Sequence, residues 1–207
     1  MESETAKQVM VTLLAAFIII VAAIGVSYAA FTYANEGSTI NVIKPGEIYL
    51  KLNESKTGIS MLNAVPLSDL EGTSLIEEGS FYSFNITSTL KSGSNIIYDI
   101  VLKSNLDKIS PKMIKVYLVE VDGESTPVES EKVILAPTYL SNLKRSELAN
   151  GESLFRGNLV QGDNIVTNYR LKVWISDHDA DGNFISVDKI DENALIEVKL
   201  GLYAKES

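Results

Sequence analysis

An uninterrupted apolar segment near the N-terminus is the strongest pattern in the chain. Residues 9–31 contain no charged side chain. As a helix, about 23 residues extend roughly 34 Å, which is enough to cross the hydrocarbon core of a bilayer. A run this long and this apolar is atypical of a helix inside a soluble core. The pattern therefore predicts a membrane-inserted segment that exports the rest of the chain.

After insertion, this segment is either cleaved by signal peptidase or retained as a membrane anchor. Small residues, Ser27 and Ala29, stand at the positions that signal peptidase recognises, which favours cleavage after Ala29. The apolar run is longer than the usual core of a signal peptide and its leader has no excess of positive charge, which favours a retained anchor. We therefore expect residues 1–31 to be a signal peptide or an N-terminal membrane anchor. Residues 32–207 are expected to form one extracellular domain.

Beyond the apolar run, apolar and polar positions alternate in a way that is typical of strands with one buried face. In residues 47–52, for example, Ile48, Leu50 and Leu52 share one side. The same period recurs in residues 82–87, 96–103, 114–118, 171–175 and 196–202. Turns that contain glycine and asparagine separate these segments. The pattern predicts an all-β fold, an antiparallel two-sheet β-sandwich of jelly-roll-like topology with eight to ten strands.

Two features depart from this alternation. Leu140, Leu143 and Leu148 are spaced more like a helix than a strand, so we expect a short surface helix within residues 137–148. Trp174 falls on the polar side of its expected strand. There it is either an exposed contact residue or is covered by a neighbouring loop.

The charge and residue content limit the partners of the domain and the bonds that hold it together. The formal net charge of −9 disfavours nucleic acid and anionic lipid head groups, because both carry phosphate charge. The chain has no cysteine, which excludes disulfides and thiolate-bound zinc. We therefore expect core packing to stabilise the domain, with a bound cation as a candidate addition.

An acidic loop over residues 177–188 is the sharpest local motif. Carboxylates at its positions 1, 3 and 5, glycine at 6, an apolar residue at 8 and an acid at 12 follow the twelve-residue calcium loop. The candidate ligands of a structural Ca²⁺ ion are Asp177, Asp179, Asp181, Asn183 and Asp188. The match has two departures, because Asp188 is shorter than the usual glutamate and the flanking segments have strand periodicity. A solvated acidic turn is the alternative.

A second short pattern spans the end of the apolar run and the first expected strand. It consists of a glycine, an aromatic residue, Ala-Ala-Phe, a polar stretch, and a glycine two residues before a strand. These residues are Gly25, Tyr28, Ala29, Ala30, Phe31, Gly46, Ile48 and Leu50. With residues 58–66, 81–84 and 98–102 as successive early strands, this part of the chain resembles the TasA and camelysin family of exported proteins. The similarity is best over residues 25–104.

The resemblance implies a jelly-roll protein of the cell surface. Several members of the family assemble into biofilm fibres, in which an N-terminal strand of one subunit completes the sheet of the next. For this chain, the implied donor is residues 30–52 and the implied function is structural, with self-association into fibres. A retained anchor would instead tether the donor segment to the membrane.

Catalytic motifs are absent from the sequence. His178 is the only histidine, so the two-histidine helix of a zinc protease cannot form, although camelysin-like proteins have been classed as metallopeptidases. The chain also has no Gly-x-Ser-x-Gly motif and no glycine-rich phosphate loop. We therefore expect no enzymatic activity. Asn53 and Asn85 match the N-glycosylation pattern, and Asn85 is expected on an outward face.

Three functions remain open at this point. The first is a secreted or cell-surface structural protein of the TasA-like type that forms or decorates extracellular fibres. The second is a membrane-anchored envelope or virion protein that does not polymerise. The third is a calcium-dependent adhesion module. A type IV pilin is a weaker alternative, because no basic-Gly processing site precedes the apolar run.

Overall fold

The computed structural model describes most of the chain after the first strand begins. The described residues are 48–54, 58–62, 64–75, 81–91, 95–123 and 127–206. They all belong to one compact unit, Gly37–Ser207. The export segment predicted in residues 1–31 and residues 30–47 of the implied donor lie outside the described residues. Within the described part, no helix is long and apolar enough to span a membrane.

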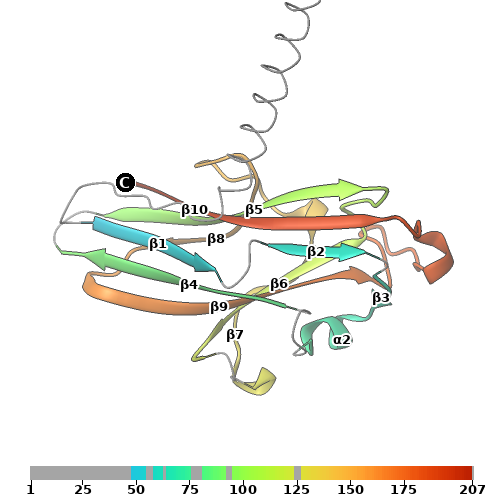
Figure 1. The fold of residues 1–207 in the computed structure, drawn as a ribbon, viewed down its shortest axis with the longest axis horizontal. Coiled ribbons are helices and arrows are strands. Elements are labelled where there is room, and N and C mark those ends of the chain that lie inside the picture. Colours follow the sequence, from blue (N-terminus) through green and yellow to red (C-terminus); the bar gives the residue numbers. More distant parts are fainter. Residues whose placement is uncertain are drawn as a thin grey trace, which may run out of the picture. The chain divides into compact units, whose positions relative to one another are not determined.

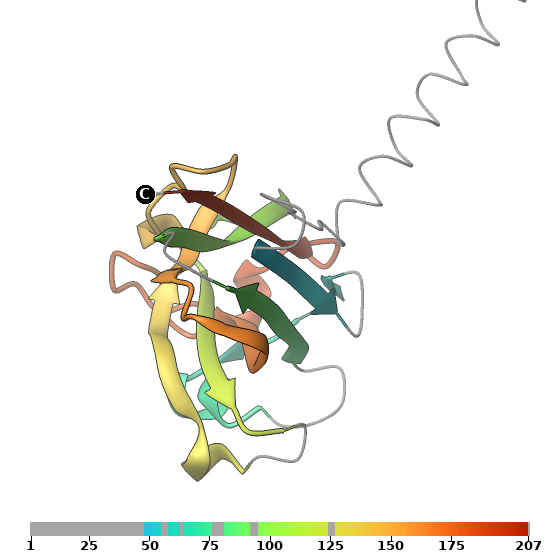
Figure 2. The same ribbon diagram turned by 90° about the vertical axis from the view of Figure 1, so that its left-hand side faces the viewer.

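The described residues form two facing sheets (Figures 1 and 2). Sheet A has six strands, in the order β1-β4-β9-β6-β7 with β3 beside β9, and sheet B has four, in the order β2-β10-β5-β8. The strands are β1 (Ile48–Glu54), β2 (Ile59–Leu62), β3 (Pro66–Leu67), β4 (Phe81–Leu90), β5 (Ile96–Asp107), β6 (Ile114–Val121), β7 (Lys132–Tyr139), β8 (Glu152–Asn158), β9 (Gly162–Ser176) and β10 (Leu195–Glu206). Every pairing is antiparallel except that of β3 with β9. The predicted all-β, antiparallel two-sheet fold is confirmed.

The main core lies between the two sheets. Alternate residues of β1, β4 and β10 are buried, as the period of the sequence predicts. Leu50 in sheet A and Ile100 in sheet B are fully buried in this cluster. The rings of Phe84 and Tyr169, on neighbouring strands, stack with their centroids 5.3 Å apart. Hydrophobic burial on one face of each sheet therefore supplies the core of the domain.

The short helix expected within residues 137–148 is present only as one 3₁₀ turn. β7 continues to Tyr139, and only a single 3₁₀ turn, η2 (Leu140–Asn142), follows it. Tyr139 pairs with Lys115 of β6, and Leu140 is buried against the main core. Strand pairing and this buried side chain outweigh the local leucine spacing, as tertiary contacts often do.

The outer face of sheet A carries a second, smaller core. The short helix α2 (Asp69–Thr73) begins with a capping box, in which Glu71 N donates to Ser68 Oγ and Ser68 N donates to a Glu71 carboxylate oxygen. Gly72 lies against Trp174, because a Cβ added there would be 2.3 Å from the indole ring. Trp174 is therefore covered, here by a helix, and is 2% exposed.

A buried ion-pair cluster lies beside this tryptophan. Arg170 and Lys172 occupy alternate positions of β9, and both donate to the carboxylate of Glu131, which follows the short turn η1 (Val128–Ser130). The Lys172 ammonium also donates to the Thr73 carbonyl at 2.6 Å. All three charged side chains are at most 2% exposed. The cluster thus joins both covering segments, α2 and residues 127–131, to the middle of sheet A.

Removing the central carboxylate is expected to destabilise the domain strongly. Glu131→Gln leaves two buried cations without their anion, which is expected to reduce the free energy of unfolding by about 3–5 kcal/mol. Urea denaturation measures the loss. As a control, Lys132→Ala breaks the exposed Lys132–Glu120 pair and is expected to cost less than about 1 kcal/mol. Equal losses in the two variants would contradict the importance of the buried cluster.

Candidate functional site

The acidic loop lies at one end of the sandwich, between β9 and β10, and includes the turn η3 (Val187–Lys189). Backbone hydrogen bonds hold its first half against neighbouring segments. Asp177 N donates to the Leu67 carbonyl at 3.0 Å, and Ile185 N donates to the Asp177 carbonyl at 2.8 Å. The His178 side chain is half exposed, with Nδ1 3.1 Å from an Asp177 carboxylate oxygen.

The five predicted ligands do not converge on one point. Asp179 accepts hydrogen bonds from the backbone N–H groups of Asp181 and Asn183 and from the Asn183 amide, which lowers the pKa of Asp179. Asp181 forms an ion pair with Lys112 at 2.8 Å. The pKa of Asp188 is also lowered, chiefly by a hydrogen bond from Ser186. Among the described residues, which include all five ligands, no three acidic or histidine side chains are grouped to hold a metal ion.

Calcium binding by this loop stays a prediction, and it has a direct test. Millimolar calcium is expected to raise the melting temperature of the protein, because binding to the folded state alone stabilises it. Asp177→Ala combined with Asp181→Ala is expected to abolish the rise, whereas Lys112→Ala, which frees the Asp181 carboxylate, is expected to enlarge it. Differential scanning calorimetry provides the measurement, and an unchanged melting temperature in the parent protein would exclude this metal site.

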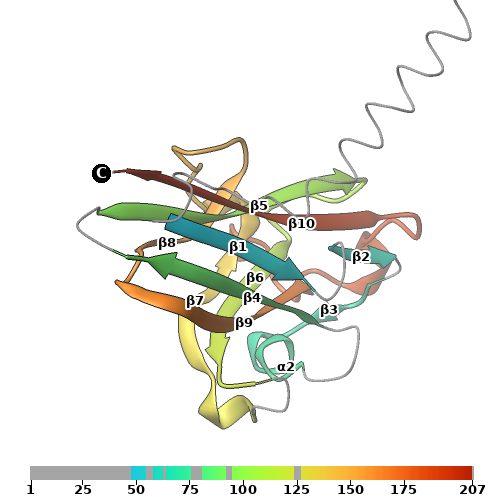
Figure 3. The ribbon, with the colours of Figure 1, turned by 60° about the vertical axis from the view of Figure 1, so that its left-hand side comes forward.

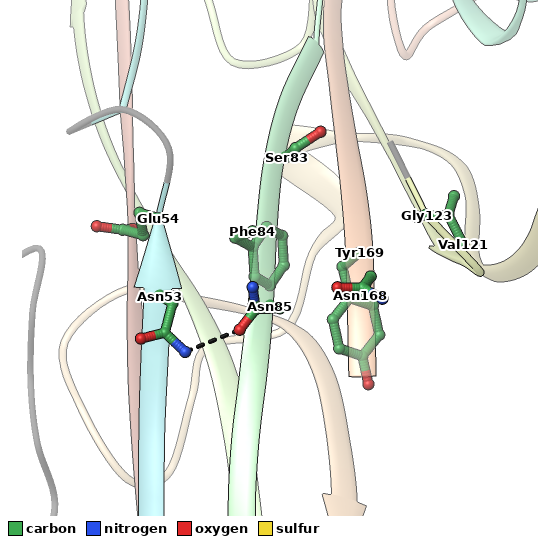
Figure 4. Close-up of a pocket in the computed structure, with 9 residues that line it drawn as sticks. All are labelled: Asn53, Glu54, Ser83, Phe84, Asn85, Val121, Gly123, Asn168 and Tyr169. Carbon is green, nitrogen blue, oxygen red and sulfur yellow. Dashed lines mark hydrogen bonds between the residues drawn. The ribbon is translucent and has the colours of Figure 1, made fainter. Parts of the chain in front are cut away.

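A pocket of about 240 Å³ on the outer face of sheet A is the second candidate site (Figure 4). We call it the amide pocket, because three asparagine side chains stand in it. It is lined by Asn53, Glu54, Ser83, Phe84, Asn85, Val121, Gly123, Asn168 and Tyr169. β1, β4 and β9 form its floor, and the end of β6 lies along one side. Sequence reasoning missed this pocket, since it depends on strand register.

Strand register places the three asparagines in one row. Asn85 is paired with Asn53 on one side and with Asn168 on the other, and Asn168 is paired with Val121. Because neighbouring strands lie about 4.8 Å apart, the amides are close neighbours across the sheet. Asn53 Nδ2 donates to Asn85 Oδ1 at 2.8 Å (Figure 4). It also donates to Thr87 Oγ1 at 3.0 Å. The Asn168 amide makes no hydrogen bond within the described part of the chain.

Glu54 lies at the border of the amide pocket, at the end of β1. Burial raises the pKa of its carboxyl group to about 7, and a hydrogen bond with Tyr82 partly opposes the rise. The folded protein therefore holds a protonated carboxyl group here in mildly acidic solution. Glu54 is paired with Phe84 and bonds to Tyr82, both in the main core, so its carboxyl group lies on the inner face of sheet A and is directed away from the asparagines (Figure 4).

The raised pKa predicts a dependence of stability on pH. Between about pH 4.5 and pH 7 the unfolded carboxyl ionises while the folded one keeps its proton, so this group destabilises the fold increasingly as pH rises. Glu54→Gln is therefore expected to stabilise the protein by about 1–2 kcal/mol near pH 8, after allowance for solvent screening, and by almost nothing near pH 4. Urea denaturation at both pH values measures this, with exposed Glu192→Gln as control. A pH-independent effect of Glu54→Gln would contradict the assignment.

The edge formed by β1 is the third feature with functional potential. β1 ends sheet A, and no described strand pairs with its other side (Figure 3). Its inward side chains, Ile48, Leu50 and Leu52, are at most 3% exposed. Residues 48–52 were the last part of the implied donor, and the structure pairs them with β4 of the same chain. Of the implied donor, only residues 30–47 are not committed to this pairing, and they lie outside the described residues.

Comparison of the chain with known protein families, with curated proteins and with solved structures finds no match.

Proposed function

We propose that this protein is an extracellular structural protein of the TasA-like type whose jelly-roll-like domains join through the β1 edge of sheet A. In this proposal the chain is secreted or held at the cell surface by its N-terminal segment, and its role is mechanical, not enzymatic. The observation that carries the proposal is the regular edge of β1, with which no described strand pairs on its outer side. An open strand edge offers a row of backbone donors and acceptors to an added strand.

The five edge strands in the described part of the chain differ in how they are protected, and β3 is only two residues long and contains Pro66. β7 contains Pro137 and pairs irregularly with β6, and both features discourage further strand pairing. β2 is only four residues long, and β8 has a register shift against β5. β1, in contrast, is seven residues long, contains no proline and pairs with β4 without a bulge. Natural proteins usually block such an edge unless it is used.

The sequence offers a matching strand in the residues that precede β1. Within residues 39–42, Ile40 and Val42 alternate with Thr39 and Asn41, which suits a strand that is added to a sheet. Pro45 follows shortly and would end the added strand. We infer that this segment of one copy lies beside β1 of the next copy.

Cysteine cross-linking tests this contact, because the natural chain contains no cysteine. Copies with Lys51→Cys in β1, mixed with copies with Asn41→Cys, are expected to form an intermolecular disulfide, since adjacent strands bring paired residues within bonding distance. Non-reducing electrophoresis detects the product. Lys132→Cys, on the protected edge strand β7, is the matched control. A yield no higher than that of the control would refute strand addition at β1.

Mass spectrometry of the exported protein separates this proposal from the membrane-anchored alternative. The long, charge-free apolar run of residues 9–31 favours the alternative. An N-terminus near Ala30 would release the donor segment and is the expected result. Recovery of the uncut leader would favour a tethered envelope component that does not polymerise.

A further inference from the structure

The outer face of sheet A is divided into a covered and an uncovered part, and the amide pocket lies at their boundary. On β9, Arg170 and Lys172 are buried beneath the covering segments, whereas Asn168 lies beyond them. Val121 at the end of β6 is 7% exposed and forms the apolar side of the pocket. The cover thus ends at a row of amides, and a hollow remains beside them (Figure 4).

The amides in the pocket have hydrogen-bonding capacity that the described protein does not use. Asn53 Nδ2 donates hydrogen bonds to Asn85 and Thr87, and the side-chain oxygen of Asn53 remains available as an acceptor. The Asn85 Nδ2 group and the whole Asn168 amide are also available. The pocket therefore presents both donors and acceptors, without a cation. A ligand whose groups both donate and accept is complementary to this arrangement.

Charge and size narrow the chemistry of that ligand. No lysine or arginine lines the pocket, so phosphate and carboxylate groups find no counter-charge there. A volume of about 240 Å³ is below the roughly 300–1,000 Å³ of pockets for drug-sized molecules, and it suits a small, hydroxyl-rich unit.

We propose that the amide pocket binds one residue of a neutral polysaccharide, with Asn53, Asn85 and Asn168 hydrogen-bonding to sugar hydroxyls and Val121 contacting the apolar face of the ring. This binding goes beyond the proposed function, because strand addition at β1 requires no ligand.

Isothermal titration of the exported protein with neutral oligosaccharides tests the proposal. The probes are oligomers of glucose and of N-acetylglucosamine, with an acidic uronic-acid oligomer for comparison. Asn168→Ala is the informative variant, because its amide makes no hydrogen bond within the described part of the chain and its loss should leave the melting temperature unchanged. We expect at least one neutral probe to bind, and Asn168→Ala to weaken that binding about tenfold, the change expected from losing about one to two hydrogen bonds.

Asn105→Ala is the matched control. Its amide donates to Glu197 on the other sheet, away from the pocket, so it is expected to leave the affinity for the sugar unchanged. Absence of binding to every neutral probe at millimolar concentration would overturn the inference, as would equal weakening by the two variants or equal binding of the acidic oligomer. If Asn168→Ala instead reduced the Lys51–Asn41 cross-link and left sugar binding intact, the pocket would receive a second copy of the chain, and the inference would also fail.

Discussion

The burial of β9 on both faces is the constraint on which the rest of the structure depends. One face packs into the main core, with Leu171 at its centre, and the other carries two cations and Trp174. Water cannot solvate cations at these positions, so the carboxylate of Glu131 has to reach them. Residues 127–131 are thereby fixed over sheet A, and α2 covers the neighbouring part of the same face. Where the cover ends, at Asn168, the amide pocket begins.

The amide pocket and the β1 edge share a strand and are therefore physically linked. Asn53 belongs to β1, and its hydrogen bonds to Asn85 and Thr87 add side-chain contacts to the backbone pairing of β1 with β4. A ligand that occupies the pocket restrains the outer face of this strand. A neighbouring strand restrains its open side. If both proposals hold, each contact reduces the conformational freedom that β1 loses when the other forms, so sugar binding and strand addition would favour each other.

The alternation of apolar and polar residues was sufficient to predict the two-sheet fold. Every second side chain of a strand points to the same face, so the apolar positions show directly which side chains face a core. The alternation located six strands, but within β9 it found only residues 171–175 of Gly162–Ser176. The same reasoning placed Trp174 on the polar side of its strand but could not show that helix α2 covers it, since the covering segment comes from a distant part of the chain. Helix α2 was missed although Ser68 and Glu71 form a recognisable capping box. The amide pocket was not predictable, because the row of asparagines exists only in the observed register.

The acidic loop shows why a local sequence motif does not by itself identify a metal site. The same residues suit either a hydrogen-bonded turn or a calcium-binding loop. An aspartate followed by a tight turn accepts hydrogen bonds from backbone N–H groups two and four residues ahead, as Asp179 does from Asp181 and Asn183. The same spacing of oxygens and glycine also suits calcium coordination. Lys112, 69 positions away from Asp181, pairs with its carboxylate, and a calcium ion would have to compete with this ammonium group. Both side chains are about half exposed, so the pair contributes about 1 kcal/mol or less and does not by itself decide whether the loop binds metal.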